Sequence, residues 1–226
     1  MTTRWLWARR VATVGTLLLI ATTTGLWAQH TTGDFHGCPP EGEGGDPALS
    51  ELKNRDVAPE SYEDMVLIDL IRTKPSEAIA MGKRHRDKWT AEAIASVDDL
   101  EAKGVRVEGR LIAIRTQGPE SCNCGSDTDV DTHMWIATVA SASAKPTRSM
   151  VVEVSPREVE GHPGWDHDVF VSLAKKGTRV RISGWITWDE EHGSEVGKSR
   201  GTLWEIHPIH RIEVFQDGAW RDLDEQ

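Results

Sequence analysis

Cysteine, tyrosine and phenylalanine are scarce in this sequence, and several common enzyme motifs are missing from it. The 226 residues include three Cys, one Tyr and three Phe. Three cysteines cannot supply the second Cys pair that an all-cysteine zinc cage needs. The sequence also has no G-x-S-x-G segment, no glycine-rich phosphate loop and no Ser/His/Asp spacing. It therefore gives no indication of serine-hydrolase or phosphate-loop chemistry.

Basic residues are outnumbered by acidic ones. The chain has 26 Lys+Arg against 36 Asp+Glu, and its formal net charge is -10. An acidic surface repels polyphosphate at long range, which disfavours non-specific nucleic-acid binding. The partner that we expect is instead an unidentified ligand or a protein of the cell envelope.

The N-terminal segment has the pattern of an export signal. Three Arg and no acid fall in the first ten residues, an apolar run covers 11–26, and polar residues begin at Gln29. This order predicts a signal peptide over 1–28 and a periplasmic or extracellular mature protein. Leu26 fits the usual cleavage pattern poorly, so an uncleaved N-terminal anchor is the alternative. Contact with the membrane is expected only through that segment.

The three cysteines are Cys38, Cys122 and Cys124. Export permits disulfides, so we expect at least one pair among them and one thiol left over. The alternative is a metal site that uses both of the closely spaced thiols, Cys122 and Cys124.

The remaining chain divides by composition and periodicity. Segment 29–58 is rich in Gly, Pro, Thr and acid, and we interpret it as a flexible linker. Segment 59–104 has apolar residues at helical spacing, which predicts helices over 59–73 and 75–104. The period changes to two from Val105 onward, which predicts a β domain over 105–226.

That domain is predicted to be mainly β with α additions. The expected strands cover 105–115, 133–139, 150–155, 178–188 and 203–214. One helix, over 166–176, falls between the third and fourth strands, and the order β-β-β-α-β-β is that of an OB-like five-stranded barrel. Gly109 and Gly184 lie inside strands, where they suit the sharp bends of a small barrel. An open sheet with helices on one side is the alternative.

Several polar residues lie at or near the ends of the expected strands, where a barrel can bring them together. This candidate polar site comprises His133, Glu153, Arg157, Asp189, His192, Glu205 and His207. The spacing matches no single motif, so the ligand stays undefined. No cofactor is predicted apart from a possible divalent metal ion at His133, Glu153 and His207.

Glu153 and His207 each have a simpler interpretation. Glu153 interrupts a run of valines, so it either faces solvent or pairs with an arginine such as Arg181. A strand histidine before proline typically satisfies a backbone group or packs beside a neighbour such as Trp204. A buried Glu153, however, would be a functional-site candidate.

The acidic stretch 127–131 resembles the start of a calcium loop. The sixth position of such a loop is Gly and the twelfth is Glu, whereas this chain has Thr132 and Thr138. We therefore expect a solvated acidic loop, with a weak cation site as the alternative.

Tryptophans on the expected strands raise the possibility of a stacking platform for a ligand. Trp188 alternates in phase with Ile182 and Ile186, which predicts a core position. Trp185 falls on the opposite face of the same strand, and it is the candidate for an exposed stacking contact.

A set of short segments resembles a family of exported bacterial proteins with an OB-like domain and a WEIHP-type C-terminal motif. The segments lie between about residues 100 and 215, and they are Ser121–Gly125, Asp131–His133, Val151–Arg157, Val180–Trp185 with Asp189 and His192, and Thr202–Ile209. The resemblance implies export and the barrel fold, and it brings no activity. At the level of the fold the chain is also similar to secreted thermonuclease-type barrels, but their Asp, Arg and Glu catalytic pattern cannot be placed on it.

The sequence favours a non-enzymatic, exported OB-type binding module. The alternative is a metal-dependent hydrolase, such as a phosphodiesterase, that uses His133, Glu153, His192 and His207. An interaction or structural role at the envelope is a third possibility.

Overall fold

The computed structural model describes residues 33–76, 85–139 and 145–225. Its strands are β1 (Glu63–Met65), β2 (Gly104–Thr116), β3 (Thr132–Ala137), β4 (Ser149–Val154), β5 (Arg179–Trp188), β6 (Trp204–Gln216) and β7 (Ala219–Asp222). Its α-helices are α1 (Pro47–Lys53), α2 (Leu67–Arg72), α4 (Ala91–Glu101), α5 (Pro156–Val159) and α6 (His167–Lys176). Short 3-10 helices cover Arg86–Lys88, Ser121–Asn123, Pro146–Arg148, Glu190–Glu195 and Leu223–Glu225. The expected signal segment lies outside the described residues.

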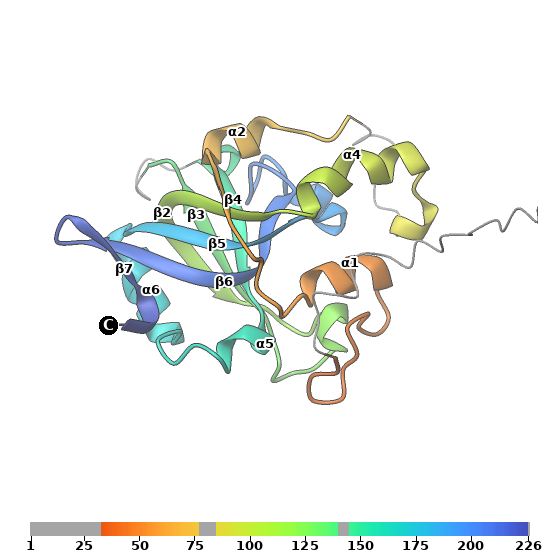
Figure 1. The fold of residues 1–226 in the computed structure, drawn as a ribbon, viewed down its shortest axis with the longest axis horizontal. Coiled ribbons are helices and arrows are strands. Elements are labelled where there is room, and N and C mark those ends of the chain that lie inside the picture. The colour runs from red at the N-terminus through yellow and green to blue at the C-terminus, as the bar shows by residue number, and fades with distance from the viewer. Residues whose placement is uncertain (1–32, 77–84, 140–144, 226) are drawn as a thin grey trace, which may run out of the picture.

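Strands β2 to β6 close into a five-stranded mixed barrel (Figure 1). The strand order around it is β2-β3-β4-β6-β5, and β5 pairs back onto β2. All neighbours are antiparallel except β4 and β6, which run parallel. Strand β1 extends β2 in parallel, and β7 forms a hairpin with β6. The prediction of a mainly β, OB-like barrel is confirmed.

The barrel closes where the backbones of β5 and β6 approach closely. A Cβ atom on Gly184 would lie 2.2 Å from the carbonyl oxygen of Pro208, so only glycine fits there. The register between the two strands shifts on both sides of Gly184. The peptide between His207 and Pro208 is cis. The register irregularity lies beside His207.

Helix α6 sits between β4 and β5 in the sequence, as predicted. The Asp166 side chain caps its N-terminus by accepting a hydrogen bond from the Asp168 backbone NH, and Gly177 ends it in the left-handed conformation. Helices α5 and α6 lie on one side of the barrel, and α2 and α4 lie on the other (Figure 1).

The two helices expected before the barrel differ from the structure. Part of the stretch 59–73 forms strand β1, because Glu63–Met65 pairs in register with Val105–Val107. Tertiary pairing has overridden the helical spacing there, and only α2 remains. Within 75–104, the described residues form a 3-10 helix and then α4, which ends before Gly104 enters β2.

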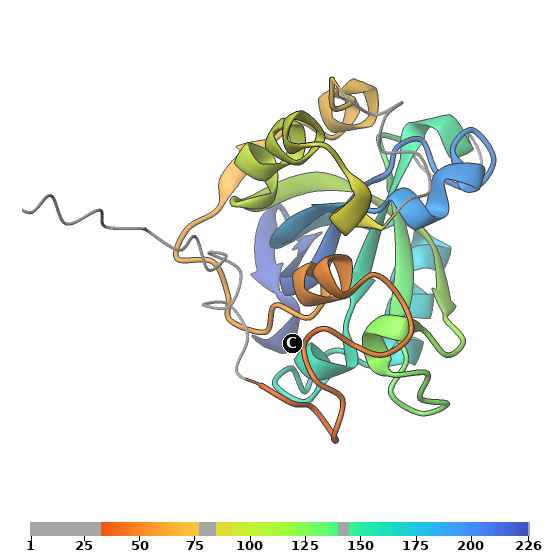
Figure 2. The same cartoon turned by 90° about the vertical axis from the view of Figure 1, so that its right-hand side faces the viewer.

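The prediction of a flexible linker over 29–58 is wrong for the described residues 33–58, because these residues pack against the barrel. Asp46 accepts hydrogen bonds from the backbone NH groups of Ala48 and Leu49 and so starts α1. Leu49 and Leu52 are each 2% exposed. Figure 2 shows α1 lying across one end of the barrel. Burial of these apolar side chains fixes a segment whose composition is that of a linker.

The described helices are all too short or too polar to cross a membrane.

Candidate metal centre

Three barrel strands bring the central residues of the site together. His133 on β3 is the direct cross-strand partner of Glu153 on β4. Glu205 and His207 lie two positions apart on β6, so their side chains leave the same face of that strand. The four side chains are at most 1% exposed. The sequence placed these residues near strand ends, and the fold buries them on the strand face opposite to the core residues Met134, Val152 and Ile206, beneath α1.

Glu153 lies between two imidazoles. Its Oε2 atom is 2.9 Å from Nε2 of His133 and 3.0 Å from Nδ1 of His207. Neither contact has hydrogen-bond geometry, and these three atoms, together with Glu153 Oε1, find no hydrogen-bond partner in the described part of the chain. Buried polar atoms almost always have partners, so a group of them without any requires an explanation. This position contradicts the expectation that Glu153 faces solvent or pairs with Arg181.

The side chains near Glu153 form three overlapping trios. In each trio one potential ligand atom per residue lies within 4.8 Å of the other two. The trios are Glu120, His133 and Glu153; Asp131, Glu153 and His207; and Glu120, Cys122 and Asp131. We call these six residues the metal cluster. Imidazole, carboxylate and thiolate groups are the ligands that zinc and related ions prefer.

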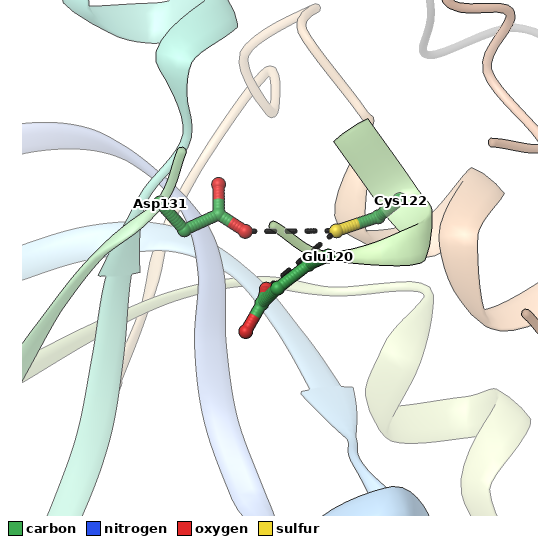
Figure 3. A group of neighbouring side chains, drawn as sticks. All are labelled: Glu120, Cys122 and Asp131. Carbon is green, nitrogen blue, oxygen red and sulfur yellow. Dashed lines mark hydrogen bonds between the residues drawn. The ribbon is translucent and has the colours of Figure 1, made fainter. Parts of the chain in front are cut away.

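Figure 3 shows the trio nearest the surface. The thiol of Cys122 points to both carboxylates, with Sγ 3.6 Å from Asp131 Oδ2 and 3.8 Å from Glu120 Oε2. Cys122 and Asp131 are buried, whereas Glu120 is partly exposed. Glu120 thus connects the buried cluster to the surface.

The cluster perturbs the pKa values of its members. Burial alone would raise the pKa of Glu153, but the His133 and His207 imidazoles beside it hold that pKa well below its ordinary value. Burial alone would lower the pKa of His207, but the Glu153 and Asp131 carboxylates raise it to about 10. Burial, together with the Asp131 and Glu153 charges, raises the pKa of Glu120 to about 7. Without an ion, protons therefore offset the clustered negative charge at neutral pH.

A second layer of charged groups surrounds the metal cluster. Lys53 Nζ lies 2.6 Å from Asp189 Oδ2, and the same oxygen lies 2.8 Å from His192 Nδ1. Arg200 Nη1 donates a hydrogen bond of 3.0 Å to Glu205 Oε2. Each acid of this layer is thus matched by a base.

A pocket of about 200 Å³ leads to the cluster from outside. It is lined by Leu49, Ser50, Lys53, Glu120, Ser121, Cys122, Glu191 and His192. Glu120 and Cys122 belong both to this pocket and to the metal cluster, so an ion or small ligand has a path to them.

His192 stands at the pocket beside the cluster. Its ring centre is 6.1 Å from that of His133, and the rings meet edge to face. Burial alone would lower the pKa of His192, but the hydrogen bond to Asp189 and the charge of that residue raise it to about 9. Asp189 thereby fixes the orientation of the ring.

Of the seven expected site residues, six lie in this region and Arg157 does not. The Arg157 guanidinium donates hydrogen bonds to the carbonyl oxygens of Gly33 at 2.7 Å and of Cys38 at 2.9 Å. It holds the N-terminal segment against the barrel and takes no part in the cluster.

The expectation of an exposed Trp185 is wrong. Its side chain is 4% exposed, its Nε1 donates to the Val57 carbonyl, and the Arg55 guanidinium lies 4.7 Å from the ring centre. The segment expected to be a linker covers it. Trp188 is in the core, as predicted.

The cysteines confirm the expectation of a disulfide and a remaining thiol. Cys38 and Cys124 are bonded, and Cys122 is free and buried. The disulfide ties the loop that carries Glu120 and Cys122 to the N-terminal segment. Burial and the neighbouring Asp131 raise the pKa of the Cys122 thiol well above its ordinary value.

Sequence reasoning missed Glu120, Lys53 and Arg200, and it assigned Asp131 to a solvated loop. Asp131 is fully buried. These residues lie in loops or in the supposed linker, where periodicity gives no direction for a side chain. One available signal was the position of Asp131 and Glu120 on either side of Cys122, within a short loop leading into His133.

No protein-family model, curated protein or solved structure matches this chain. A functional assignment therefore depends on the geometry of the site itself.

Proposed function

We propose that the protein is a binding module whose barrel holds a divalent transition-metal ion. The proposed ligands are Glu120, His133 and Glu153, whose ligand atoms lie within 4.8 Å of one another and of which Glu120 also lines the pocket. Two carboxylates and one imidazole form an incomplete shell that leaves a position for a pocket ligand. Zn²⁺ and Mn²⁺ both accept such a set.

One observation carries this proposal. The facing atoms of Glu153, His133 and His207 are buried and closely spaced, yet they make no hydrogen bonds within the described residues. Leaving such atoms unpaired costs about 1–3 kcal/mol each. An ion bound by Glu120, His133 and Glu153 satisfies the facing atoms of His133 and Glu153 at once, and metal sites contribute binding free energy to the folded state.

The test is a Zn²⁺ titration of the chelator-stripped full chain in competition with a chromophoric chelator. We expect tight binding by the wild type and weakening of at least about 10–100-fold in Glu153→Gln and His133→Ala. His210→Ala is a matched control, because His210 is also a buried histidine of β6 but its Nδ1 lies 2.8 Å from Glu158 Oε2, outside the cluster. Wild-type affinity no better than that of Glu153→Gln would refute the proposal.

Metal-dependent hydrolysis is a second candidate. It is favoured by the pocket, which gives a substrate access to the cluster, and by His192, which Asp189 orients at the pocket wall. The experiment is an assay of the metal-loaded protein on a chromogenic phosphodiester, with His192→Gln as the variant. Turnover lost in His192→Gln while Zn²⁺ affinity is retained would support hydrolysis, and no turnover in the wild type leaves binding as the function.

We also propose that the module is exported and acts in the periplasm or outside the cell. The N-terminal sequence pattern and the Cys38–Cys124 pair support this proposal. Intact-mass analysis of the protein from an expressing cell is expected to show a chain that begins near Gln29, outside the cytosol. Full-length protein in the cytosolic fraction would contradict it.

A further inference from the structure

We infer that the barrel holds two divalent ions, with the Glu153 carboxylate bridging them. The first ion is the one proposed above, and the inference rests on that proposal. The second would take Asp131, Glu153 and His207 as ligands. These three residues form the deeper trio, and none is more than 1% exposed.

The way in which the trios overlap is the first argument. Each of the three carboxylates belongs to two trios: Glu120, Asp131 and Glu153. Each of the other ligands belongs to only one: Cys122, His133 and His207. Between the two trios that would take an ion, the Glu153 carboxylate is shared and the His133 and His207 imidazoles are not, which is the arrangement expected of neighbouring ions bridged by one carboxylate. In two-metal sites the ions lie about 3.5–4 Å apart, a separation that one carboxylate can span.

The positions of the two histidines give a second argument. Glu153 Oε2 has the His133 nitrogen at 2.9 Å and the His207 nitrogen at 3.0 Å. The two imidazoles nevertheless fall in different trios. An ion beside His133 therefore leaves His207 and Asp131 to a second position, on the other side of Glu153.

Unpaired atoms mark the second position independently. Asp131 Oδ1, Glu153 Oε1 and His207 Nδ1 are all buried without a hydrogen-bond partner among the described residues. His207 Nε2 also lies 3.8 Å from Asp131 Oδ2, which is too long for a hydrogen bond. A single ion at the first trio would leave these deeper groups unsatisfied.

The charges of the cluster also fit two ions. The three carboxylates of the two trios, Glu120, Asp131 and Glu153, carry three negative charges when ionised, more than one divalent cation offsets. The surrounding layer is already balanced, because Lys53 faces Asp189 and Arg200 faces Glu205. One ion would leave an excess of buried negative charge, which is costly in a low-dielectric interior.

The experiment counts Zn²⁺ ions per chain in the full-length, chelator-stripped protein after titration and removal of free metal. We expect two ions in the wild type and in the His210→Ala control. We expect one ion in His207→Ala and in Asp131→Asn, since both variants keep the first trio. Asp131→Asn provides the test if His207→Ala does not fold. Co²⁺ in place of Zn²⁺ should give an electron paramagnetic resonance spectrum of two coupled ions in the wild type and of an uncoupled ion in the variants.

The outcomes separate this inference from the proposal on which it rests. One ion in the wild type, unchanged in His207→Ala, would overturn the second site and leave the first intact. Two ions in both variants would place the second ion elsewhere and so refute the assignment. An absence of bound Zn²⁺ in the wild type would refute the metal site as a whole.

Discussion

Two clusters of buried charge lie in this molecule, and their hydrogen bonding differs sharply. In the arginine cluster, formed by Arg55, Arg86, Glu101 and Glu190, the guanidinium of Arg86 makes two hydrogen bonds to the Glu101 carboxylate, of 2.7 and 2.8 Å. Glu101 also accepts from the Trp188 backbone NH, and Arg86 also donates to the Trp188 carbonyl. The two terminal nitrogens of Arg86 and the two carboxylate oxygens of Glu101 thus all have hydrogen-bond partners.

Arg55 is satisfied in the same way. It is fully buried and donates to the carbonyl oxygens of Leu52, Glu101 and Ile186. Burial lowers its pKa to about 9, although the Glu101 charge partly offsets the effect. Helix α4 is thereby fastened to the turn after α1 and to β5.

The metal cluster shows the opposite state. Glu153, His133 and His207 approach one another as closely as the members of the arginine cluster do, but their facing atoms make no hydrogen bonds within the described chain. The comparison teaches that burial of charge alone does not mark a functional site. The paired atoms of Arg86, Glu101 and Arg55 stabilise the fold, whereas ligand atoms that converge without pairing leave a place for a ligand.

The largest effect is expected from breaking the arginine cluster. Glu101→Ala strands the buried guanidinium of Arg86, so the free energy of unfolding should fall by about 3–5 kcal/mol. Urea denaturation measures it. Glu108→Ala is the control, because Glu108 pairs with Arg179 at the exposed surface and should cost no more than about 1 kcal/mol. Equal losses in both variants would show that burial adds nothing.

Opening the disulfide should have the next largest effect. The Cys38–Cys124 bond joins residues 86 positions apart, and Cys38→Ser should lower the free energy of unfolding by about 2–5 kcal/mol. Because the bond holds the loop that carries Glu120, Zn²⁺ affinity should fall as well. Denaturation with and without reductant gives the first quantity and calorimetry the second. A variant with unchanged Zn²⁺ affinity would show that the loop is held by its other contacts.

Metal should stabilise the protein through the metal cluster alone. At a free Zn²⁺ concentration 100 times the dissociation constant, the wild type should gain about 2.7 kcal/mol of unfolding free energy. Glu101→Ala should retain that gain, and Glu153→Gln should lose it. Thermal melting of each protein with Zn²⁺ and with chelator measures the difference. A gain of the same size in Glu153→Gln would locate the ion outside the metal cluster.

The smallest effect concerns Glu190, the one acid of the arginine cluster whose oxygens find no hydrogen bond among the described residues. Burial, with a contribution from Asp189, raises its pKa from 4.5 to about 8, although Arg86 partly offsets the shift. Between these values the folded protein holds a proton that the unfolded chain has released. The titration of Glu190 therefore lowers the free energy of unfolding as the pH rises from about 4.5 to 8.

Glu190→Gln removes this titration. At pH 8.5 the variant should be at least about 1 kcal/mol more stable than the wild type, and near pH 4 the two should be equal. Denaturation midpoints across this range test it. A wild-type advantage at pH 8.5 would mean that the ionised Glu190 is held by Arg86 after all.

The sequence predicts the barrel well because apolar residues recur at every second position along its strands, and because Gly184 stands where the register between β5 and β6 shifts. It predicts the segment before the barrel poorly. The helical spacing of 59–73 is outweighed by the pairing of β1 with β2, and the linker-like composition of 33–58 conceals the buried Leu49 and Leu52. Both outcomes depend on contacts with residues distant in the sequence.

The residues of the candidate site also differ in how well the sequence predicts their positions. His133, Glu153 and His207 lie on strands, so their positions follow from the strand order once the barrel is recognised. Glu120 and Asp131 lie in the loop between β2 and β3, whose course depends on the disulfide and on the N-terminal segment. No period in the sequence shows that these two carboxylates turn inward.

The central claim is that the unpaired atoms around Glu153 are metal ligands. The most direct test is anomalous scattering at the zinc absorption edge from crystals of the full chain prepared with Zn²⁺. The account predicts a peak at the metal cluster, at about 2.0–2.2 Å from His133 Nε2 and from a Glu153 oxygen. A barrel without a peak, in which Glu153 accepts well-aligned hydrogen bonds from His133 and His207, would contradict it.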